Sequence, residues 1–460
     1  MNLKKNDLLT VDICDITNLG FGVAKVDGAV IFVSDTVPGD RAKIKIIKAA
    51  PSYHIARLEE LITPSGARVK DRCTVSACKS CAYKSLSYED ELKIKENGVA
   101  DAFKKAGLAS IKVAPVTPSP EVCHYRNKAQ YPIELTKDGE YKIGFFAPKS
   151  HRVTEAAKCP LAPSVFGEIL DTVRHFFKKH ALSVYNEETG AGLLRHIYLR
   201  RAEVSGEVLL TLIINGERLP AGDELVSEIK KKHPEVVGVL LNINKENTNV
   251  ILGEKFITLW GQDYITDTLG GVKLKITAPS FYQVNHGAAE LLYKKAKELA
   301  DLDPGDTLLD LYCGAGSIGL SMADKAGEVI GIEIVESAVE CAKFNARENG
   351  IKNAEFYAGD AKNTERMLEN ATKARGKAIN PDVVILDPPR SGSSSELLHF
   401  IARLSPKRIV YVSCNPTTLA RDTVILKELG YDTDTVYPFD LFPATGHVES
   451  VVCLKRTAVN

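Results

Sequence analysis

A glycine-rich turn, an Asp-Pro-Pro corner and a cysteine follow one another in the C-terminal third of the chain, and together they indicate one chemistry. The glycine-rich turn at 314–316 is of the kind that holds a nucleotide-like cofactor. The sequence Asp-Pro-Pro-Arg at 387–390 stands where a methyl group would be transferred, and Cys414 follows at the expected tip of the next strand. A cysteine beside an Asp-Pro-Pro corner indicates methylation of a pyrimidine carbon.

The cofactor pattern is Gly-Ala-Gly-Ser-Ile-Gly at 314–319, between an apolar strand and an expected helix. Glycines let the backbone turn sharply, and the helix start supplies free N–H donors. Glu333 ends the next expected strand, where an acidic side chain accepts hydrogen bonds from ribose hydroxyls. NAD would fit this pattern too, but Asp310 before the turn, the Asp-Pro-Pro corner and the lack of room for a hydride-acceptor domain favour S-adenosylmethionine. Asp360, after the third strand, is placed to reach the adenine amine or belongs to a plain surface turn.

Methylation at C5 of uracil needs a nucleophile and a base. C5 becomes reactive only when a thiolate adds to C6, and the extra C5 proton must later be removed. An exocyclic amine, the other target of Asp-Pro-Pro enzymes, has its own lone pair and needs neither group. Cys414 is the candidate nucleophile and Glu449 the candidate base, with His447 as an alternative base. Cys414 could also be a buried structural cysteine, but its turn follows an apolar strand, and α/β sites form at strand C-terminal ends.

The composition of the 460 residues, 44% hydrophobic and 26% charged, is that of an ordinary soluble globular protein. The 59 basic and 59 acidic residues give a formal net charge of zero, so any nucleic-acid site must be local. No apolar run approaches a membrane span and no signal-peptide core follows the first residues, so we expect a cytoplasmic protein without a membrane partner. Its ten cysteines are therefore not expected to form a disulfide framework.

The expected elements divide this α/β chain into three domains. Residues 1–62 hold short strands, with Asp-Gly at 27–28 as a type I′ hairpin turn, and suit an OB-like β-barrel that binds oligonucleotides or only supports its neighbour. Residues 63–279 indicate a central α+β domain, with a helix over 88–105. Residues 280–460 indicate a doubly wound, Rossmann-like domain. Its continuous apolar strands are expected at 307–311, 328–332, 382–386 and 408–412.

These motifs resemble the RNA uracil-5-methyltransferases, and within them the ribosomal RNA branch that carries an iron–sulfur cluster. The resemblance extends over almost the full length, from a TRAM-like barrel to the His-Val-Glu sequence at 447–449. Its most specific segments are Gln-Val-Asn at 283–285 and Ser-Cys-Asn-Pro-Thr-Thr-Leu-Ala-Arg-Asp at 413–422. The resemblance implies a C-terminal methyltransferase domain that uses S-adenosylmethionine to methylate uridine in 23S ribosomal RNA. We expect a monomer.

The resemblance also implies roles for single residues. The side chains that would contact S-adenosylmethionine are Gln283, Tyr312, Glu333 and Asp387. Cys414 would be the nucleophile and Glu449 the proton acceptor. Arg126 would lie near the target uridine, which must leave its stack to be reached. A [4Fe–4S] cluster, which would tie the central domain together rather than carry electrons, would be held by Cys73, Cys78, Cys81 and Cys159.

Several alternatives remain open. The spacing C-x4-C-x2-C also occurs in plant-type [2Fe–2S] proteins, and four cysteines could hold zinc. The same reaction could act on the transfer RNA T-loop, although relatives dedicated to that substrate usually lack the barrel and the cysteine cluster. A nicotinamide-dependent oxidoreductase and a non-catalytic RNA-binding module are the candidates from other classes. Intact Gln283, Cys414 and Glu449 argue against the second.

Overall fold

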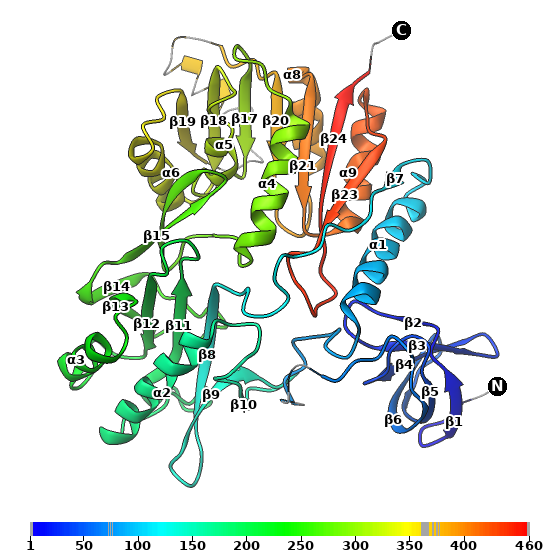
Figure 1. Ribbon diagram of the computed structural model, residues 1–460, viewed down its shortest axis with the longest axis vertical. Helices are drawn as coiled ribbons and strands as arrows, with labels where there is room; N and C mark the ends of the chain where they lie inside the picture. Colours follow the sequence, from blue (N-terminus) through cyan, green and yellow to red (C-terminus); the bar gives the residue numbers. More distant parts are fainter. Residues whose placement is uncertain are drawn as a thin grey trace.

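The computed structural model describes residues 3–71, 73, 75, 77–359, 368–369, 372–373, 376 and 378–457. Figure 1 shows a small N-terminal β domain, a central sheet with two helices on it, and a larger C-terminal sheet flanked by helices. Within the described ranges, we find no helix whose length and hydropathy would let it cross a bilayer.

The N-terminal domain is a six-stranded sheet with the order β1-β5-β6-β4-β3-β2. Its strands are β1 Leu8–Asp12, β2 Asp15–Ile16, β3 Gly22–Val26, β4 Ala29–Ser34, β5 Arg41–Ala49 and β6 His54–Thr63. Asp27 and Gly28 join β3 to β4 with φ angles of 48° and 81°, as a type I′ turn requires. Ile31, Ile44 and Ile46 are buried in the core of this domain. The sequence predicts this β-rich domain, and the two-residue β2 is an additional strand.

Helix α1, Tyr88–Lys105, has the bounds that the sequence predicts. The Ser87 hydroxyl caps it by accepting a hydrogen bond from the Asp90 amide at 3.1 Å. Val99 and Phe103 of α1 are buried in one core with strands of the C-terminal sheet. After the helix, β7 (Lys112–Val113) pairs in parallel with β23 (Thr435–Phe439) at the edge of that sheet. This segment, which we expected in the central domain, therefore packs on the C-terminal sheet.

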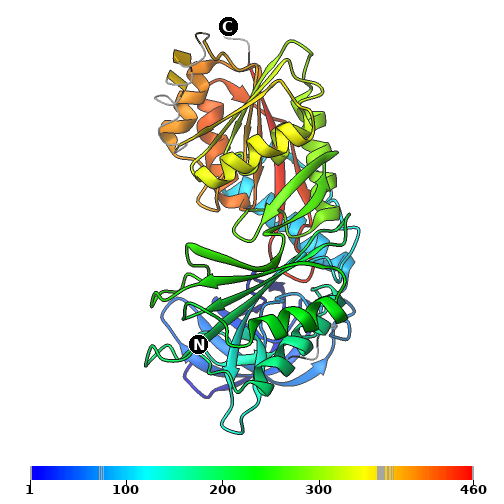
Figure 2. The same cartoon turned by 90° about the vertical axis from the view of Figure 1, so that its left-hand side faces the viewer.

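The central sheet has the order β10-β9-β8-β11-β12-β13-β14. Its strands are β8 Lys128–Leu135, β9 Tyr141–Phe146, β10 Val153–Glu155, β11 Leu194–Arg201, β12 Val208–Ile214, β13 Val236–Ile243 and β14 Lys255–Gly261. Tyr131, Ile197 and Leu199 face a core shared with α2 (Ser164–Lys179) and α3 (Gly222–Lys232). Figure 2 shows these helices on the side of the sheet away from the C-terminal domain, so the other face is turned toward that domain.

The C-terminal sheet runs β19-β18-β17-β20-β21-β24-β23, with β7 at its edge. Its further strands are β17 Thr307–Leu311, β18 Glu328–Glu333, β19 Ala354–Ala358, β20 Val383–Leu386, β21 Arg408–Ser413 and β24 Glu449–Arg456, with β22 Tyr431–Asp432 beside β24. The strands from β19 to β21 are parallel, whereas β24 is antiparallel to both its neighbours.

Both faces of this sheet are covered. Leu308 lies in one core with the helices α4 His286–Ala300, α5 Ser317–Ser321 and α6 Glu336–Glu348. Leu309 lies in a second core with α1, α8 Ser395–Leu404 and α9 Pro416–Glu428. The sheet is therefore doubly wound, as predicted. A hairpin of β15 (Tyr264–Leu269) and β16 (Val272–Thr277) connects it to the central domain.

Candidate active site

The cofactor turn follows β17 and requires backbone conformations that favour glycine. Gly314 and Gly316 have φ angles of 54° and 80°. The buried carboxylate of Asp310 accepts a hydrogen bond from the Gly319 amide at 2.9 Å, which fixes the start of α5. The Glu333 carboxylate at the end of β18 accepts one from the Gly314 amide at 3.0 Å. The turn is thus tied to acidic residues at the ends of two adjacent strands.

A cavity of about 840 Å³ lies against this turn. The expected cofactor residues in its wall are Gln283, Tyr312, Glu333 and Asp387. Cys414, His447 and Glu449 line the same cavity. The structure thus brings the expected nucleophile, both candidate bases and the expected cofactor residues to one place, except for Asp360, which lies outside the described residues.

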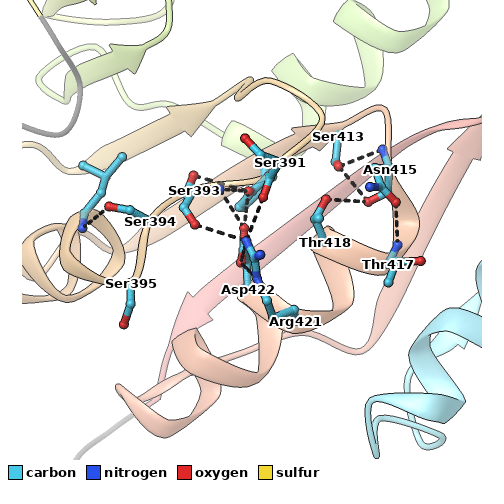
Figure 3. Close-up of polar contacts among 12 residues, drawn as sticks. Ser391, Ser393, Ser394, Ser395, Ser413, Asn415, Thr417, Thr418, Arg421 and Asp422 are labelled. Carbon is cyan, nitrogen blue, oxygen red and sulfur yellow. Dashed lines mark hydrogen bonds and ion pairs between the residues drawn. The ribbon is translucent and has the colours of Figure 1, made fainter.

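Cys414 lies in the turn between β21 and α9. The residue after it, Asn415, caps the helix (Figure 3). The side-chain oxygen of Asn415 accepts a hydrogen bond from the Thr417 amide at 3.1 Å. Its Nδ2 donates to the Arg390 carbonyl at 3.1 Å. Asn415 therefore positions both the start of α9 and the end of the Asp-Pro-Pro-Arg corner.

The next turn of α9 holds the loop that follows this corner (Figure 3). The buried Asp422 carboxylate accepts hydrogen bonds from the Ser393 amide at 2.9 Å and from the Tyr411 hydroxyl at 2.6 Å. Arg421 donates to the Ser391 carbonyl at 3.0 Å. The segment 413–422 is therefore one structural unit, which places the cysteine and the acidic corner relative to each other.

Burial dominates the electrostatics of the cavity. It raises the pKa of Asp387 to about 7. Burial, together with the neighbouring Asp387, raises the pKa of Glu449 to about 8, although Arg390 opposes the shift. Burial and then Glu449 raise the pKa of the Cys414 thiol to about 11. Without a ligand, the cavity therefore holds a protonated thiol beside carboxyl groups of raised proton affinity, and a bound cation would favour the ionised forms of these carboxyl groups.

The two candidate bases reach the cavity from different elements. Glu449 is the first residue of β24, is 6% exposed, and pairs in register with Phe439 of β23. His447 lies in the preceding loop, with its Nε2 3.4 Å from Nη2 of Arg390. Burial, and after it the charge of Arg390, lowers the pKa of His447. The strand-anchored carboxylate is therefore the stronger base of the two.

A buried ion cluster holds the loop that leads to Glu449, and the sequence analysis missed it. Nζ of Lys95 in α1 lies 2.6 Å from Oε1 of Glu91 and 2.7 Å from Oδ1 of Asp440. It also donates to the carbonyl of the cavity-lining Phe442 at 3.2 Å. The Ala444 amide donates to Glu91 at 2.8 Å. The Glu-x-x-x-Lys spacing in α1 signals a helix ion pair, but Asp440 is 345 residues away from Lys95.

The four expected metal-ligating cysteines surround a second, smaller cavity of about 80 Å³. They are Cys73, Cys78, Cys81 and Cys159, and Lys84 and Arg126 also line it. Burial and the other three cysteines raise the pKa of Cys81 to about 12, against an opposing effect of Arg126. In the described part of the chain, no group of three or more histidine, cysteine or acidic side chains is arranged to hold a single metal ion. Arg126 thus lies beside the cysteines rather than in the wall of the larger cavity.

The comparison with family models accounts for both the C-terminal sheet and the N-terminal domain. Residues 87–457 match the model described as tRNA (Uracil-5-)-methyltransferase, and residues 3–58 match the TRAM domain. The chain belongs to this uracil-5-methyltransferase family. It is an RNA (uracil-5-)-methyltransferase with an N-terminal TRAM domain.

Relatives of this RNA (uracil-5-)-methyltransferase align with it from end to end. An uncharacterized RNA methyltransferase of Clostridium acetobutylicum is 40% identical over 458 residues, 99% of this chain and 98% of the relative. Another, of Bacillus cereus, is 41% identical over 456 residues, with the same coverage of 99% and 98%.

A solved structure shares the fold. The Pyrococcus abyssi tRNA (uracil-54, C5)-methyltransferase in complex with S-adenosyl-L-homocysteine has a TM-score of 0.78 and 27% identity, covering 97% of this chain and 100% of its own. The RNA (uracil-5-)-methyltransferase described here is accordingly a mixed α/β enzyme that uses S-adenosylmethionine as its methyl donor.

Proposed function

We propose that this enzyme methylates C5 of one or more uridines in 23S ribosomal RNA through a covalent bond between Cys414 and C6 of the base. The observation that carries the proposal is that Cys414 and Glu449 face the same cavity of about 840 Å³ as the cofactor turn. Methylation of an amine would need neither the thiol nor a proton acceptor of this kind.

Cofactor binding is assigned to Gln283, Tyr312, Glu333 and Asp387. S-adenosylmethionine supplies a methyl group on a cationic sulfonium, and a cation in the cavity lowers the free energy of the ionised carboxylates. Glu333, already hydrogen-bonded to the Gly314 amide, is placed for the ribose hydroxyls. Asp360 is assigned to the adenine amine from its position two residues after β19.

The proposed reaction balances in three steps. Cys414 gives its thiol proton to solvent as its sulfur bonds to C6, and the C5–C6 π electrons move toward the C4 carbonyl to form an enolate. C5 then bonds to the methyl carbon as the bond from that carbon to the sulfonium sulfur breaks. Glu449 removes the C5 proton. The electron pair of the former C5–H bond then restores the C5–C6 double bond as the bond between C6 and the sulfur of Cys414 breaks. A carboxylate whose conjugate acid has a pKa of about 8 suits this last step near neutral pH.

The four cysteines are assigned to a [4Fe–4S] cluster. The donor set fits, because four thiols surround one cavity and two cations, Lys84 and Arg126, stand beside it to offset thiolate charge. A zinc site would need four sulfurs about 2.3 Å from one ion, and in the described part of the chain no group of three or more such side chains is arranged for a single ion. A bound cluster would join the 73–81 segment to Cys159 of the central domain. Iron and sulfide analysis of the purified protein tests this assignment.

Ribosomal RNA is supported as substrate by the resemblance to the ribosomal RNA branch and by the cavity that the four cysteines line. The TRAM domain does not separate the two substrates, because the similarity to a tRNA (uracil-54, C5)-methyltransferase extends over nearly the whole chain. Arg126 is assigned to the neighbourhood of the flipped-out uridine because, although it lines the cysteine cavity, its charge also acts on His447 in the wall of the larger one. A second candidate substrate is transfer RNA. It is favoured by the structural similarity, over 97% of this chain, to a tRNA (uracil-54, C5)-methyltransferase.

The experiment that tests the proposal uses labelled S-adenosylmethionine with unmodified ribosomal and transfer RNA transcripts, followed by nucleoside analysis. We expect label as 5-methyluridine in ribosomal RNA. Label in transfer RNA alone would keep the chemistry and reject the proposed substrate. Label at another nucleoside would reject the assigned roles of Cys414 and Glu449.

A further inference from the structure

Two cations without an acidic partner lie where the central sheet meets the active-site wall. Arg200 of β11 pairs in register with Lys128 of β8. Arg200 is 2% exposed and its Nη1 donates to the Ala278 carbonyl at 3.2 Å, but its Nε and Nη2 have no hydrogen-bond partner. The charges that act on Lys128 are those of Arg200 and Arg126, and no carboxylate of the described residues is among them. The positive charges of Lys128, Arg200 and Arg126 are thus close together, which is unfavourable unless an anion binds between them.

The residue before Lys128 is hydrogen-bonded to the wall of the cofactor cavity. Nδ2 of the preceding residue, Asn127, donates to the Gln283 carbonyl at 2.7 Å, and its amide donates to the Val284 carbonyl at 2.9 Å. The neighbours of Lys128 in β8, such as Ala129, face the core with α2. Because side chains alternate along a strand, Lys128 points to the opposite face, which Figure 2 shows turned toward the C-terminal domain.

We propose that Lys128 binds a backbone phosphate of the RNA close to the target uridine, with Arg200 behind it strengthening the positive potential. Arg200 has a structural task of its own on the Ala278 carbonyl. Burial, then Arg200 and Arg126, lowers the pKa of Lys128 to about 8, so the protein itself disfavours this charge. RNA supplies the missing anion, and such phosphate contacts fix the position of a nucleic acid on a protein. This inference rests on the proposed function in one respect, which is the identity of the RNA that is bound.

The test measures the salt dependence of RNA binding. Lys128→Met removes the charge and keeps the side-chain length, and Lys128→Arg restores the charge. Lys142→Met on the neighbouring strand β9 is the matched control, because that side chain is 43% exposed and lies 3.8 Å from Glu134. The probes are unmodified 23S ribosomal RNA and transfer RNA transcripts with S-adenosylhomocysteine, titrated between about 50 and 200 mM salt.

We expect the slope of log affinity against log salt to be smaller by about 0.7–0.9 for Lys128→Met, and to be unchanged for Lys128→Arg and Lys142→Met. S-adenosylhomocysteine affinity should stay constant, and Lys128→Met should melt no lower than the wild type because a repulsion has been removed. An unchanged slope for Lys128→Met, or an equal loss in Lys142→Met, overturns the inference. Absence of 5-methyluridine in ribosomal RNA rejects the proposed substrate instead, while the slope on the RNA that does bind still tests Lys128.

Discussion

The enzyme buries charge in two different ways around one active site. At Lys95 the charges are paired, since the ammonium lies within 2.7 Å of carboxylates from α1 and from the 440–446 loop. At the cavity, burial raises the pKa of Asp387 and of Glu449, and Asp387 adds to the shift of Glu449. Burial raises the pKa of Glu91 as well, but there Lys95 opposes the shift as a direct partner. Paired charges hold a loop in place. Unpaired charges favour a ligand of opposite sign, which is the sulfonium at the carboxylates and the phosphate backbone at Lys128.

The largest expected effect on activity comes from removing the sulfur of Cys414. Cys414→Ala removes the sulfur that must bond to C6, so 5-methyluridine formation should fall by roughly 10⁴-fold or more. S-adenosylhomocysteine binding, measured by calorimetry, should stay nearly unchanged. Cys341→Ala, at a half-buried cysteine of α6, is the control and should keep its activity. Retained turnover in Cys414→Ala would rule out the covalent mechanism.

The next effect tests the unpaired carboxylate directly. Glu449→Gln keeps the shape of the side chain but cannot accept the C5 proton, so turnover should fall by about 10²–10⁴-fold. Because addition and methylation precede proton removal, the enzyme should accumulate as an RNA adduct that survives a denaturing gel. Glu340→Gln on the surface of α6 should form no lasting adduct. Normal turnover in Glu449→Gln would remove Glu449 from its assigned role.

The buried ion cluster around Lys95 should affect the stability of the fold rather than the rate of methylation. Lys95→Met leaves Glu91 and Asp440 buried without their cation, which should reduce the free energy of unfolding by about 3–5 kcal/mol. Lys93→Met on the same helix breaks an exposed ion pair with Glu89 and should leave the free energy of unfolding nearly unchanged. Urea denaturation measures both. Equal losses of unfolding free energy in the two variants would mean that the buried ion pairs contribute no more to stability than the exposed pair.

The last expected effect is a pH dependence of the free enzyme. The pKa of Glu449 is raised from its ordinary value of 4.5 to about 8, so between these values the folded state keeps a proton that the unfolded chain loses. The contribution of this group to stability is therefore full below about pH 4.5 and is lost as the pH rises through about 8. Thermal melts at several pH values should show Tm falling more steeply in the wild type than in Glu449→Gln. Parallel curves would mean that Glu449 does not titrate in this range.

Much of the local structure was predictable because it depends on near neighbours. Helix α1 begins after the capping Ser87 and has the predicted bounds, and Asp27-Gly28 forms the predicted turn. The positions of Cys414 and Glu333 followed from the rule that α/β sites form at the C-terminal ends of strands. The short β2 was missed, since two residues carry too little pattern.

By itself, the sequence predicted most of the elements of the two sheets at its ends, the glycine-rich turn and the candidate reactive cysteine, because each depends on a pattern within a few residues along the chain. The tertiary structure alone decided which charges are paired. Lys95 and Asp440 are 345 residues apart, and Lys128 meets Arg200 only through the register of β8 and β11. It also placed α1 on the C-terminal sheet and Arg126 beside the cysteines. The interaction of two charges depends on their distance and burial in the folded chain, and neither is encoded in local spacing.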